Sequence, residues 1–364
     1  MRTSLALAAR NAAGLATALV LGAGLVLLGG GSPIDAYRAL FAGAFGDINS
    51  WNALLVKACP IILAGLAVAI PLRLGLFNLG GEGQMYIGAL AATLVALALP
   101  DWPPGPLILL CCLAGVIAGS AWALLAAAMN VLRGVNEVIG TLLLNYVAAN
   151  IVSWVVSGPL MEPGAPFPYS AEIAEAIHLP PLLADWDAHI GFVVAVLLAI
   201  AFQWVLSRGT IGLSIAITAR SRSAAVYAGL LPNRLTLGTF AVGGGLAGLA
   251  GAFEILGVKY RLFQGFVGGY GFDGVIAAML AGAQPAMVVV SGILLAGLKV
   301  GANSMQRAVG LPVTLVEALQ GLIIICVTAS AAWPLIEASL RHGTSSLNNR
   351  ALRLRLWLKR SNLS

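Results

Sequence analysis

Apolar runs about as long as a membrane is thick recur along the whole chain. They lie near residues 12–30, 52–70, 84–99, 107–129, 137–157, 190–207, 236–256, 272–283, 286–302 and 313–333. A helix needs roughly 20 such residues to cross the hydrocarbon core of a bilayer. Only 9% of the residues are charged, against roughly 25% in a soluble domain. We therefore predict an all-α integral membrane protein with about ten transmembrane helices.

Charges in the loops predict the orientation of the chain. The loop 207–235 holds four arginines and no acid, whereas the loop 158–189 holds five acids and no Lys or Arg. Because cytoplasmic loops carry the excess of Lys and Arg, we expect 207–235 and both termini to be cytoplasmic and 158–189 to be external. Three basic residues are exceptions to this rule, because they lie in predicted external loops: Lys259, Arg261 and Arg307. We expect one membrane domain, residues 1–335, followed by a basic cytoplasmic tail, 336–364.

Short segments recur in the same order in the two halves of the chain. "LAGLAVA" at 63–69 returns as "LAGLAGA" at 246–252, and "GGEG" at 80–83 returns as "GGYG" at 268–271. Glu137 is matched by Glu317, each at the start of an apolar run. We predict two five-helix repeats, about 12–157 and 190–333, in opposite orientations. Inverted repeats are the architecture of many transporters, with the pathway at their interface.

The stretch "LGLFNLGGEGQMYIGA" (Leu74–Ala89) places Asn78, Glu82 and Gln84 among glycines at the start of an apolar run. Glycine allows backbones to approach closely, and a broken helix can line an aqueous cavity. These polar side chains either contact a polar substrate or hold the broken segment in shape. The predicted topology puts the stretch near the cytoplasmic face, which favours a gate over a central binding site.

Few polar side chains lie at membrane depth, and we treat them as candidates for the pathway or its gate. The candidates are Asn78, Glu82, Gln84, Glu137, Asn145, Asp273 and Glu317. A glutamate in the first turn of a helix also favours the helix dipole, which explains Glu137 and Glu317 equally well. Lys57, Glu254 and Lys299 are further ionisable residues within apolar runs. Pairs of glycines at GxxxG spacing, such as Gly244 with Gly248 and Gly115 with Gly119, predict close helix packing.

The sequence lacks the motifs of the common catalytic and nucleotide-binding sites. It contains no P-loop GK[ST], HExxH or GxSxG, and "GYGFDG" (269–274) matches GxGxxG without a strand context. The four cysteines lie in apolar runs and the three histidines are isolated in predicted loops, so we expect no metal site. We therefore expect a transport subunit without a cofactor of its own rather than an enzyme. If ATP drives transport, a separate ATPase subunit binds ATP and Mg.

The loop "GLSIAITARSRSAAVYAGLLPNRLT" (Gly212–Thr236) predicts a short amphipathic helix at about Ser221–Leu230. This helix is too short to span a membrane. It is either an ordinary connecting helix or a docking element for a cytoplasmic partner. The residues assigned to such docking are Arg220, Arg222, Ala224, Ala225 and Gly229.

The motifs "FNLGGEGQMYIGA", "NEVIGTLLLNYVA", "AR…AAxxAG" and "GGYGFDGVIAAML" resemble the permease subunits of bacterial ABC importers for simple sugars and nucleosides. The resemblance covers roughly residues 50–335, and "NLGGEGQ" with "NEVI" favours the nucleoside branch. It implies a bacterial inner-membrane location, a cytoplasmic ABC ATPase, an external substrate-binding protein or lipoprotein, and a second permease, identical or different. It implies that the loop 207–235 contains the helix that couples to the ATPase.

The implied function is import of a neutral polar solute, and the branch motifs favour a nucleoside. The alternatives are a permease for a simple sugar such as ribose and, in another class, a secondary transporter or channel driven by an ion gradient.

Overall fold

The computed structural model describes residues 16–310 and scattered positions between 312 and 326. The contacts divide the chain into two units, Ile34–Gly310 and a smaller unit of Met1–Pro33 with Leu311–Ser364. In the smaller unit the described helix is Ala16–Leu28. The larger unit carries all the features discussed below.

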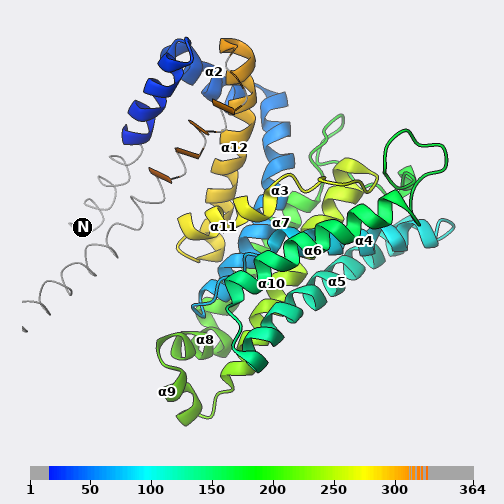
Figure 1. Cartoon of the computed structure of the whole chain (residues 1–364), viewed down its shortest axis with the longest axis vertical. Coiled ribbons are helices and arrows are strands. Elements are labelled where there is room, and N and C mark those ends of the chain that lie inside the picture. Colours follow the sequence, from blue (N-terminus) through cyan, green and yellow to red (C-terminus); the bar gives the residue numbers. More distant parts are fainter. Residues whose placement is uncertain are drawn as a thin grey trace, which may run out of the picture. The chain divides into compact units, whose positions relative to one another are not determined.

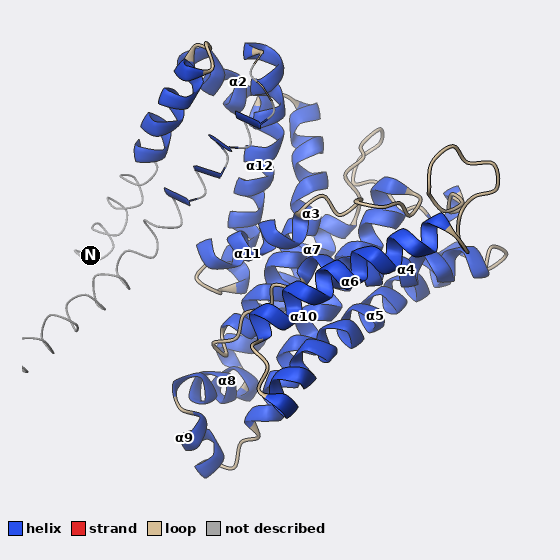
Figure 2. Cartoon of the chain, viewed as in Figure 1, coloured by secondary structure: helices blue, strands red, loops and turns tan. Residues whose placement is uncertain are grey.

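The described part of the larger unit is helical, with loops and isolated bridges between the helices (Figures 1 and 2). The helices are α2 (Pro33–Phe45), α3 (Ile48–Leu72), α4 (Gly81–Ala98), α5 (Pro104–Arg133), α6 (Glu137–Ser157), η1 (Glu175–Ile177), α7 (Gly191–Arg208), α8 (Thr210–Arg220), α9 (Arg222–Tyr227), α10 (Pro232–Glu254), the π-helix η2 (Ile255–Lys259), α11 (Tyr270–Leu280) and α12 (Pro285–Val309).

Among the described residues, six helices are long and apolar enough to cross a membrane. They are α3, α5, α6, α7, α10 with η2, and α12. A seventh candidate is formed if Ala16–Leu28 and Pro33–Phe45 are counted as one span. The prediction of an all-α, multi-pass membrane protein is confirmed in this coarser form. The predicted run 313–333 lies largely outside the described residues, so the count of ten and the inverted repeats stay predictions.

Some helices differ from those that the hydropathy pattern predicts. The structure adds α2, which lies between the first two predicted runs, and α8, which fills the start of the loop 207–235. The run predicted at 272–283 is α11, which has only 11 residues. The short helix predicted at Ser221–Leu230 is α9, which ends at Tyr227.

The centre of the larger unit is formed by α3 and α10. The most apolar windows of α3 and of α10 with η2 are 78% and 83% buried, whereas that of α7 is 22% buried. α10 packs against α3, α4 and α5, and α3 packs against α11 and α12. The nearly complete burial explains why α3 and α10 are apolar all round, and the flanks of α5, α6 and α7 are left to face lipid.

Glycines allow α4, α5 and α10 to pack backbone against backbone. A Cβ on Gly248 of α10 would lie 2.1 Å from the carbonyl oxygen of Gly115 on α5. A Cβ on Gly119 would lie 2.3 Å from the Gly244 oxygen, and one on Gly88 of α4 would lie 2.4 Å from the Gly248 Cα. The close packing predicted from the GxxxG spacing is confirmed, and it extends to a third helix.

Candidate functional site

The break between α3 and α4 begins at a proline. Pro71, in the last turn of α3, has no N–H to donate to the carbonyl of Ala67. The Asn78 side chain donates from Nδ2 to this carbonyl at 3.2 Å. The loop after α3 therefore supplies a donor for the backbone oxygen that the proline leaves without its helical partner.

Asn78 and Gln84 pair through both of their amide groups. Asn78 Nδ2 donates to Gln84 Oε1 at 3.1 Å, and Gln84 Nε2 donates to Asn78 Oδ1 at 2.9 Å. Asn78 Oδ1 also accepts from the Gly80 N–H at 3.1 Å. The two residues are 0% and 1% exposed. They hold the loop and the first turn of α4 together, and neither presents a free group to a solute.

Side chains of α6 hold the same break from the other side. Asn145 Oδ1 accepts from the Gly83 N–H at 2.9 Å, and its Nδ2 donates to the Leu79 carbonyl at 2.8 Å. Thr141 Oγ1 accepts from the Leu79 N–H at 3.3 Å. The start of α4 is thus fixed by hydrogen bonds to a second helix, and the amide of Asn145 is used in doing so.

Glu82 lies where α4 and α11 begin side by side. A Cβ on Gly271 of α11 would lie 2.3 Å from the backbone nitrogen of Glu82, so glycine is required there for the two backbones to approach. Glu82 Oε1 accepts from the Gly269 N–H at 2.8 Å. Its Oε2 is buried and has no hydrogen-bond partner among the described residues. Two helix starts, each with partial positive charge, therefore meet at a carboxylate that has one oxygen free.

A cavity of about 280 Å³ opens beside this carboxylate. This volume is near the lower end for small-molecule sites, roughly 300–1,000 Å³. The lining residues are Glu82, Tyr86, Leu142, Asn145, Tyr146, Ala149, Gly269 and Phe272. These described residues include no Lys or Arg. Tyr146 and Phe272 are 71% and 47% exposed, so two aromatic rings are accessible beside the single acid.

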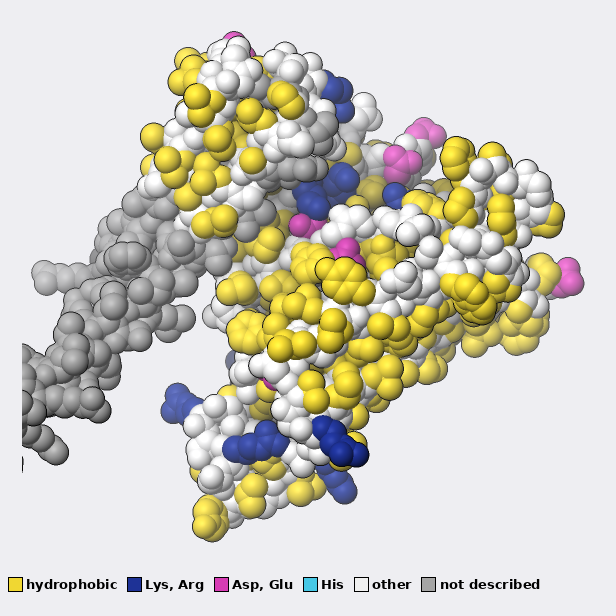
Figure 3. All heavy atoms as spheres, viewed as in Figure 1, with side chains coloured by type: hydrophobic (Ala, Val, Ile, Leu, Met, Phe, Trp, Pro, Cys, Tyr) yellow, Lys and Arg dark blue, Asp and Glu magenta, His cyan; other side chains and the backbone are white. Residues whose placement is uncertain are grey.

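Opposite charges gather close to this site, on helices that surround α11. Asp273, in the first turn of α11, pairs with Lys299 of α12 at 2.5 Å. The Lys299 Nζ also lies 5.5 Å from the centre of the Tyr270 ring. Glu254, at the end of α10, is 2% exposed. In Figure 3, dark-blue and magenta spheres meet in the middle of the face, where α3 and the loop before α11 lie in Figure 1. The ion pair attaches the start of α11 to α12.

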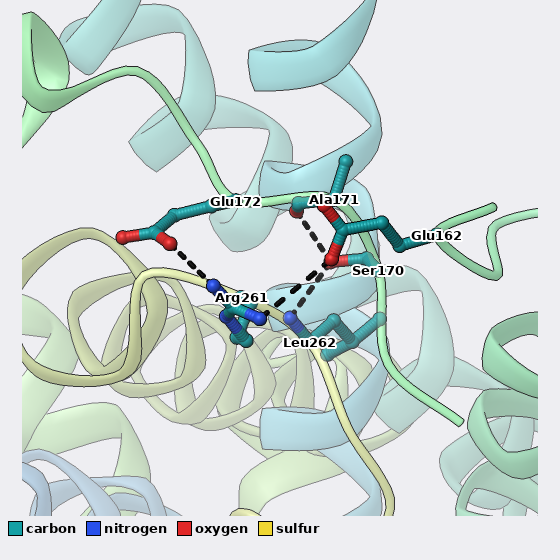
Figure 4. A network of polar contacts seen from close by, with 6 residues as sticks. All are labelled: Glu162, Ser170, Ala171, Glu172, Arg261 and Leu262. Carbon is teal, nitrogen blue, oxygen red and sulfur yellow. Dashed lines mark hydrogen bonds and ion pairs between the residues drawn. The ribbon is translucent and has the colours of Figure 1, made fainter. Parts of the chain in front are cut away.

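The acidic loop 158–189 is bound to the loop that leads into α11 (Figure 4). Arg261 forms an ion pair with Glu172, and its Nη1 lies 3.7 Å from Glu162 Oε2. The Ser170 N–H donates to the Leu262 carbonyl at 2.9 Å, and Ser170 Oγ accepts from the Leu262 N–H at 2.9 Å. The charge of Arg261, an exception to the loop charge rule, is therefore balanced by the acids of the loop that it contacts.

Two of the three histidines lie in loops of this region, as predicted, and both are packed against neighbouring residues. His178 stacks on Tyr260 with ring centres 3.8 Å apart. His189 is 3% exposed, and its Nδ1 accepts from the Gly191 N–H at 3.1 Å at the start of α7. Burial lowers the pKa of His189 to about 4, so it is neutral at pH 7. No cluster of His, Cys, Asp or Glu among the described residues is suited to hold a metal ion.

The loop 207–235 forms α8 and α9. The Ser221 side chain caps α9 by accepting from the Ala224 N–H at 3.1 Å. Arg220, Arg222 and Ala224 are exposed, whereas Ala225 is 0% exposed. Three of the five predicted docking residues therefore lie at the surface of α8 and α9, and Ala225 packs inside the chain.

Gly229 lies beyond the end of α9. Its φ of +76° is in the left-handed region, and the Leu230 N–H donates to the Ala225 carbonyl at 2.9 Å around it. This is the pattern that ends a helix at a glycine. Gly229 thus terminates α9, whereas the helix predicted from the sequence, about Ser221–Leu230, ran through this position.

Glu137 lies at the start of α6, outside the cavity lining. The side chain of Asn136 caps this helix by accepting from the Val138 N–H at 2.9 Å. Glu137 Oε2 accepts from Asn130 Nδ2 of α5 at 3.2 Å, which attaches the two helices across their turn. Its predicted counterpart, Glu317, lies outside the described residues.

Comparison with known proteins places this arrangement in a family. The family model described as the branched-chain amino acid transport system / permease component matches residues 51–328, more than half of the chain. The chain belongs to this permease family. The permease is 36% identical over 326 residues to the glucose ABC transporter permease TsgB13 of Haloferax volcanii, covering 87% of this chain and 85% of the relative.

Two further relatives of this permease are named for nucleosides. It is 33% identical over 329 residues to the guanosine ABC transporter permease NupP of Bacillus subtilis, covering 89% of this chain and 93% of the relative. It is 27% identical over 319 residues to the nucleoside ABC transporter permease NupB of Lactococcus lactis, covering 84% and 86%. The region matched to the family contains the α3–α4 break, the cavity, α8 and α9.

Proposed function

We propose that this permease is the membrane subunit of an ABC importer and that it moves a neutral, polar, ring-containing solute. A nucleoside is the solute that fits the cavity best. The observation that carries the proposal is the cavity at the starts of α4 and α11. There, the rings of Tyr146 and Phe272 flank a carboxylate with a free oxygen. A pocket of aromatic faces with few polar groups is typical of small-molecule sites.

The charge of the cavity selects the class of solute. Glu82 is the only ionisable acid or base among the lining residues apart from the tyrosines. A phosphate or carboxylate would be repelled by it and would find no cation in the lining. A nucleoside is neutral, its base can stack on an aromatic ring, and its hydroxyl and ring N–H groups can donate to the Glu82 carboxylate. The names of NupP and NupB support this choice.

A simple sugar is the second candidate, because the glucose permease TsgB13 is 36% identical to this chain. Sugar hydroxyls would donate to Glu82 equally well, and the apolar face of a sugar ring would lie on Phe272. The two candidates differ in how much they depend on stacking. Base–aromatic stacking contributes roughly 1–3 kcal/mol per base.

The energy for transport comes, in this proposal, from a separate ATPase that binds ATP and Mg. The sequence has no P-loop. Lys and Arg gather at the end of the larger unit that carries α8 and α9 (Figure 3), and Tyr227 at the end of α9 is 94% exposed. We assign this end, with Arg220, Arg222 and Ala224, to docking on the ATPase. A secondary transporter driven by an ion gradient is the alternative of another class.

Two further partners complete the proposed importer. A second permease would cover the exposed rings of Tyr146 and Phe272 and close the cavity on that side. A substrate-binding protein outside the membrane would dock on the acidic loop 158–189, which Arg261 attaches to the segment that holds Gly269. A protein that docks there would shift this segment and so alter the hydrogen bond that the Gly269 N–H donates to Glu82.

The test is uptake by cells or proteoliposomes that carry the complete transporter. Labelled uridine or adenosine should be taken up, with unlabelled nucleoside competing and ribose or glucose failing to compete. Phe272→Ala should raise the KM for the nucleoside by roughly 5- to 150-fold, the equivalent of 1–3 kcal/mol of stacking. Phe41→Ala removes an exposed ring of α2 that does not line the cavity, and it should leave KM unchanged. Sugar uptake without nucleoside competition would replace the nucleoside by the second candidate.

A further inference from the structure

A second cavity, independent of the first, lies among α3, α7, α8 and α10. Its volume is about 240 Å³. Apart from Arg234 and Thr239, its lining is aliphatic, aromatic or glycine. The Thr239 hydroxyl donates to the Thr236 carbonyl at 3.0 Å, so it needs no partner from inside the cavity. The result is a groove with apolar walls and a single charged group, the guanidinium of Arg234.

Positive charge surrounds the Arg234 end of this groove. Arg222 donates a hydrogen bond to Asn233, the residue before Arg234. Arg208 ends α7 next to the wall formed by Val205 and Leu206. The segment 207–235 contains no acid, and among the described residues no carboxylate pairs with these arginines.

Helix electrostatics do not explain the position of Arg234. It lies in the first turn of α10, where the helix dipole disfavours a cation. Arg234 is also exposed, so it is free to contact an external group. An anion at this helix end would be stabilised by both the arginine and the dipole.

The dimensions of the groove suit the upper part of an acyl chain. Arg234 and Val242 both line it, and eight residues of helix rise about 12 Å. One leaflet of hydrocarbon is about 15 Å thick, half of the ~30 Å core. Ile211 and Val242, which line the groove, are 55% and 40% exposed, so the groove is open to the surroundings of the chain.

We propose that this groove binds one anionic phospholipid, with an acyl chain between α7 and α10 and the phosphate on Arg234. Burying a lipid tail against apolar side chains gains little over leaving it in the bilayer, because both surroundings are equally apolar. Selectivity therefore comes from the headgroup. Each arginine near an anionic lipid strengthens binding by about fivefold.

Native mass spectrometry of the purified full chain in detergent tests the proposal. The chain is titrated with phosphatidylglycerol and, separately, with phosphatidylcholine of the same acyl chains. Phosphatidylglycerol should be retained more tightly. Arg234→Gln should weaken its binding about fivefold and leave phosphatidylcholine unaffected. Arg133→Gln is the matched control, because Arg133 is exposed at the end of α5 and does not line the groove.

A second variant tests the acyl chain without touching a charge. A Cβ at Gly238 meets nothing within 4 Å, so Gly238→Leu is expected to fold and to fill the groove. Because a filled groove can no longer hold the acyl chain that places the phosphate on Arg234, Gly238→Leu should remove most of the preferential phosphatidylglycerol binding, whereas Gly238→Ala should retain most of it. Equal retention of both lipids by the natural chain would overturn the proposal. It would also be overturned if Arg234→Gln and Gly238→Leu bound phosphatidylglycerol as tightly as the natural chain does. Competition by inorganic phosphate as effective as by the intact lipid would also overturn it, since the groove would then contribute nothing.

Discussion

Gly248→Ala is expected to separate α10 from α5. The new Cβ would lie 2.1 Å from the Gly115 oxygen and 3.0 Å from the Gly115 carbon and the Gly119 Cα. Carbon contacts are most favourable at ~3.5–4.0 Å, so the helices must move apart by more than about 1 Å. All the obstructing atoms belong to the backbone and cannot rotate away. Overpacking of this kind costs typically ~1–3 kcal/mol, and the absence of a flexible neighbour favours the upper end.

The net effect includes a gain in helix propensity. Alanine is better than glycine in a helix by ~1 kcal/mol, so the expected loss of unfolding free energy is about 2 kcal/mol. With an unfolding entropy of ~2.1 cal/mol/K per residue, a chain of 364 residues shifts by roughly 1.3 °C per kcal/mol. The unfolding temperature should therefore fall by roughly 2–3 °C. The assay is thermal unfolding in detergent, followed by tryptophan fluorescence.

The matched control lies on the same helix. A Cβ at Gly238 meets nothing within 4 Å, so Gly238→Ala carries the propensity gain without the clash and should unfold about 1 °C above the natural chain. The two alanine variants should therefore differ in sign. If Gly248→Ala unfolded as late as Gly238→Ala, the close packing of α5 on α10 would not exist as described.

Three further predictions follow from the site and its supports. Asn78→Leu should lower the free energy of unfolding by about 3 kcal/mol or more, because it leaves the Ala67 carbonyl and the Gln84 amide buried without hydrogen-bond partners. If a double-mutant cycle with Gln84→Met proved additive, the two amides would not pair. Lowering the pH from 7 to 4 should cost about 3 kcal/mol of stability through His189, because the folded pKa is near 4 and the unfolded imidazole takes up a proton below ~6.5. Stability from this group is complete above about pH 6.5 and is lost as the pH falls towards 4. The unfolding temperature of His189→Asn should therefore fall less steeply with pH over this range than that of the natural chain. An equal slope in both chains would refute the role given to His189. Gly229→Val should strain the end of α9 and so reduce the amount of solute transported per ATP hydrolysed by the complete transporter. Gly229→Asn should not, because asparagine tolerates the left-handed region. Equal coupling in both variants would refute the role of α9 in docking on the ATPase.

Hydropathy was sufficient to predict the membrane class and most of the apolar helices, because burial in lipid acts on every residue of a span. GxxxG spacing likewise predicted close helix packing at Gly115, Gly119, Gly244 and Gly248, but it did not indicate that these two pairs of glycines pack against each other. α2 and α8 were missed because neither is an apolar run of membrane length. α2 has 13 residues, and α8, although apolar, has 11.

The roles of the polar residues could not be separated from the sequence. Asn78, Glu82 and Gln84 lie within seven residues, yet two of them pair with each other and the third lines a cavity. Pro71 was a usable signal, because it strands the carbonyl four residues earlier and so calls for a donor such as Asn78. The contact of Gly81 and Glu82 with Gly271 joins segments far apart in the chain. The recurrence of "GGEG" as "GGYG" pointed to this pair but carried no information on distance.

One charge exception, Arg261, was also explained only by a tertiary contact. Arg261 contradicts the loop charge rule when its own loop is counted alone. In the structure it pairs with Glu172 and lies near Glu162, which come from a loop about 90 residues earlier. The charge balance is therefore set across two loops, and no count within one loop could reveal it.

The most direct test of the proposed function is ATP-dependent uptake in proteoliposomes. The permease is reconstituted with the ATPase and second permease of its system, the binding protein and labelled nucleoside are added outside, and ATP with Mg is enclosed. We expect nucleoside to accumulate only when hydrolysable ATP is inside. ADP or a non-hydrolysable analogue should abolish accumulation, and Glu82→Gln should weaken it. Accumulation by this chain alone, driven by an ion gradient without the ATPase, would contradict the proposed function.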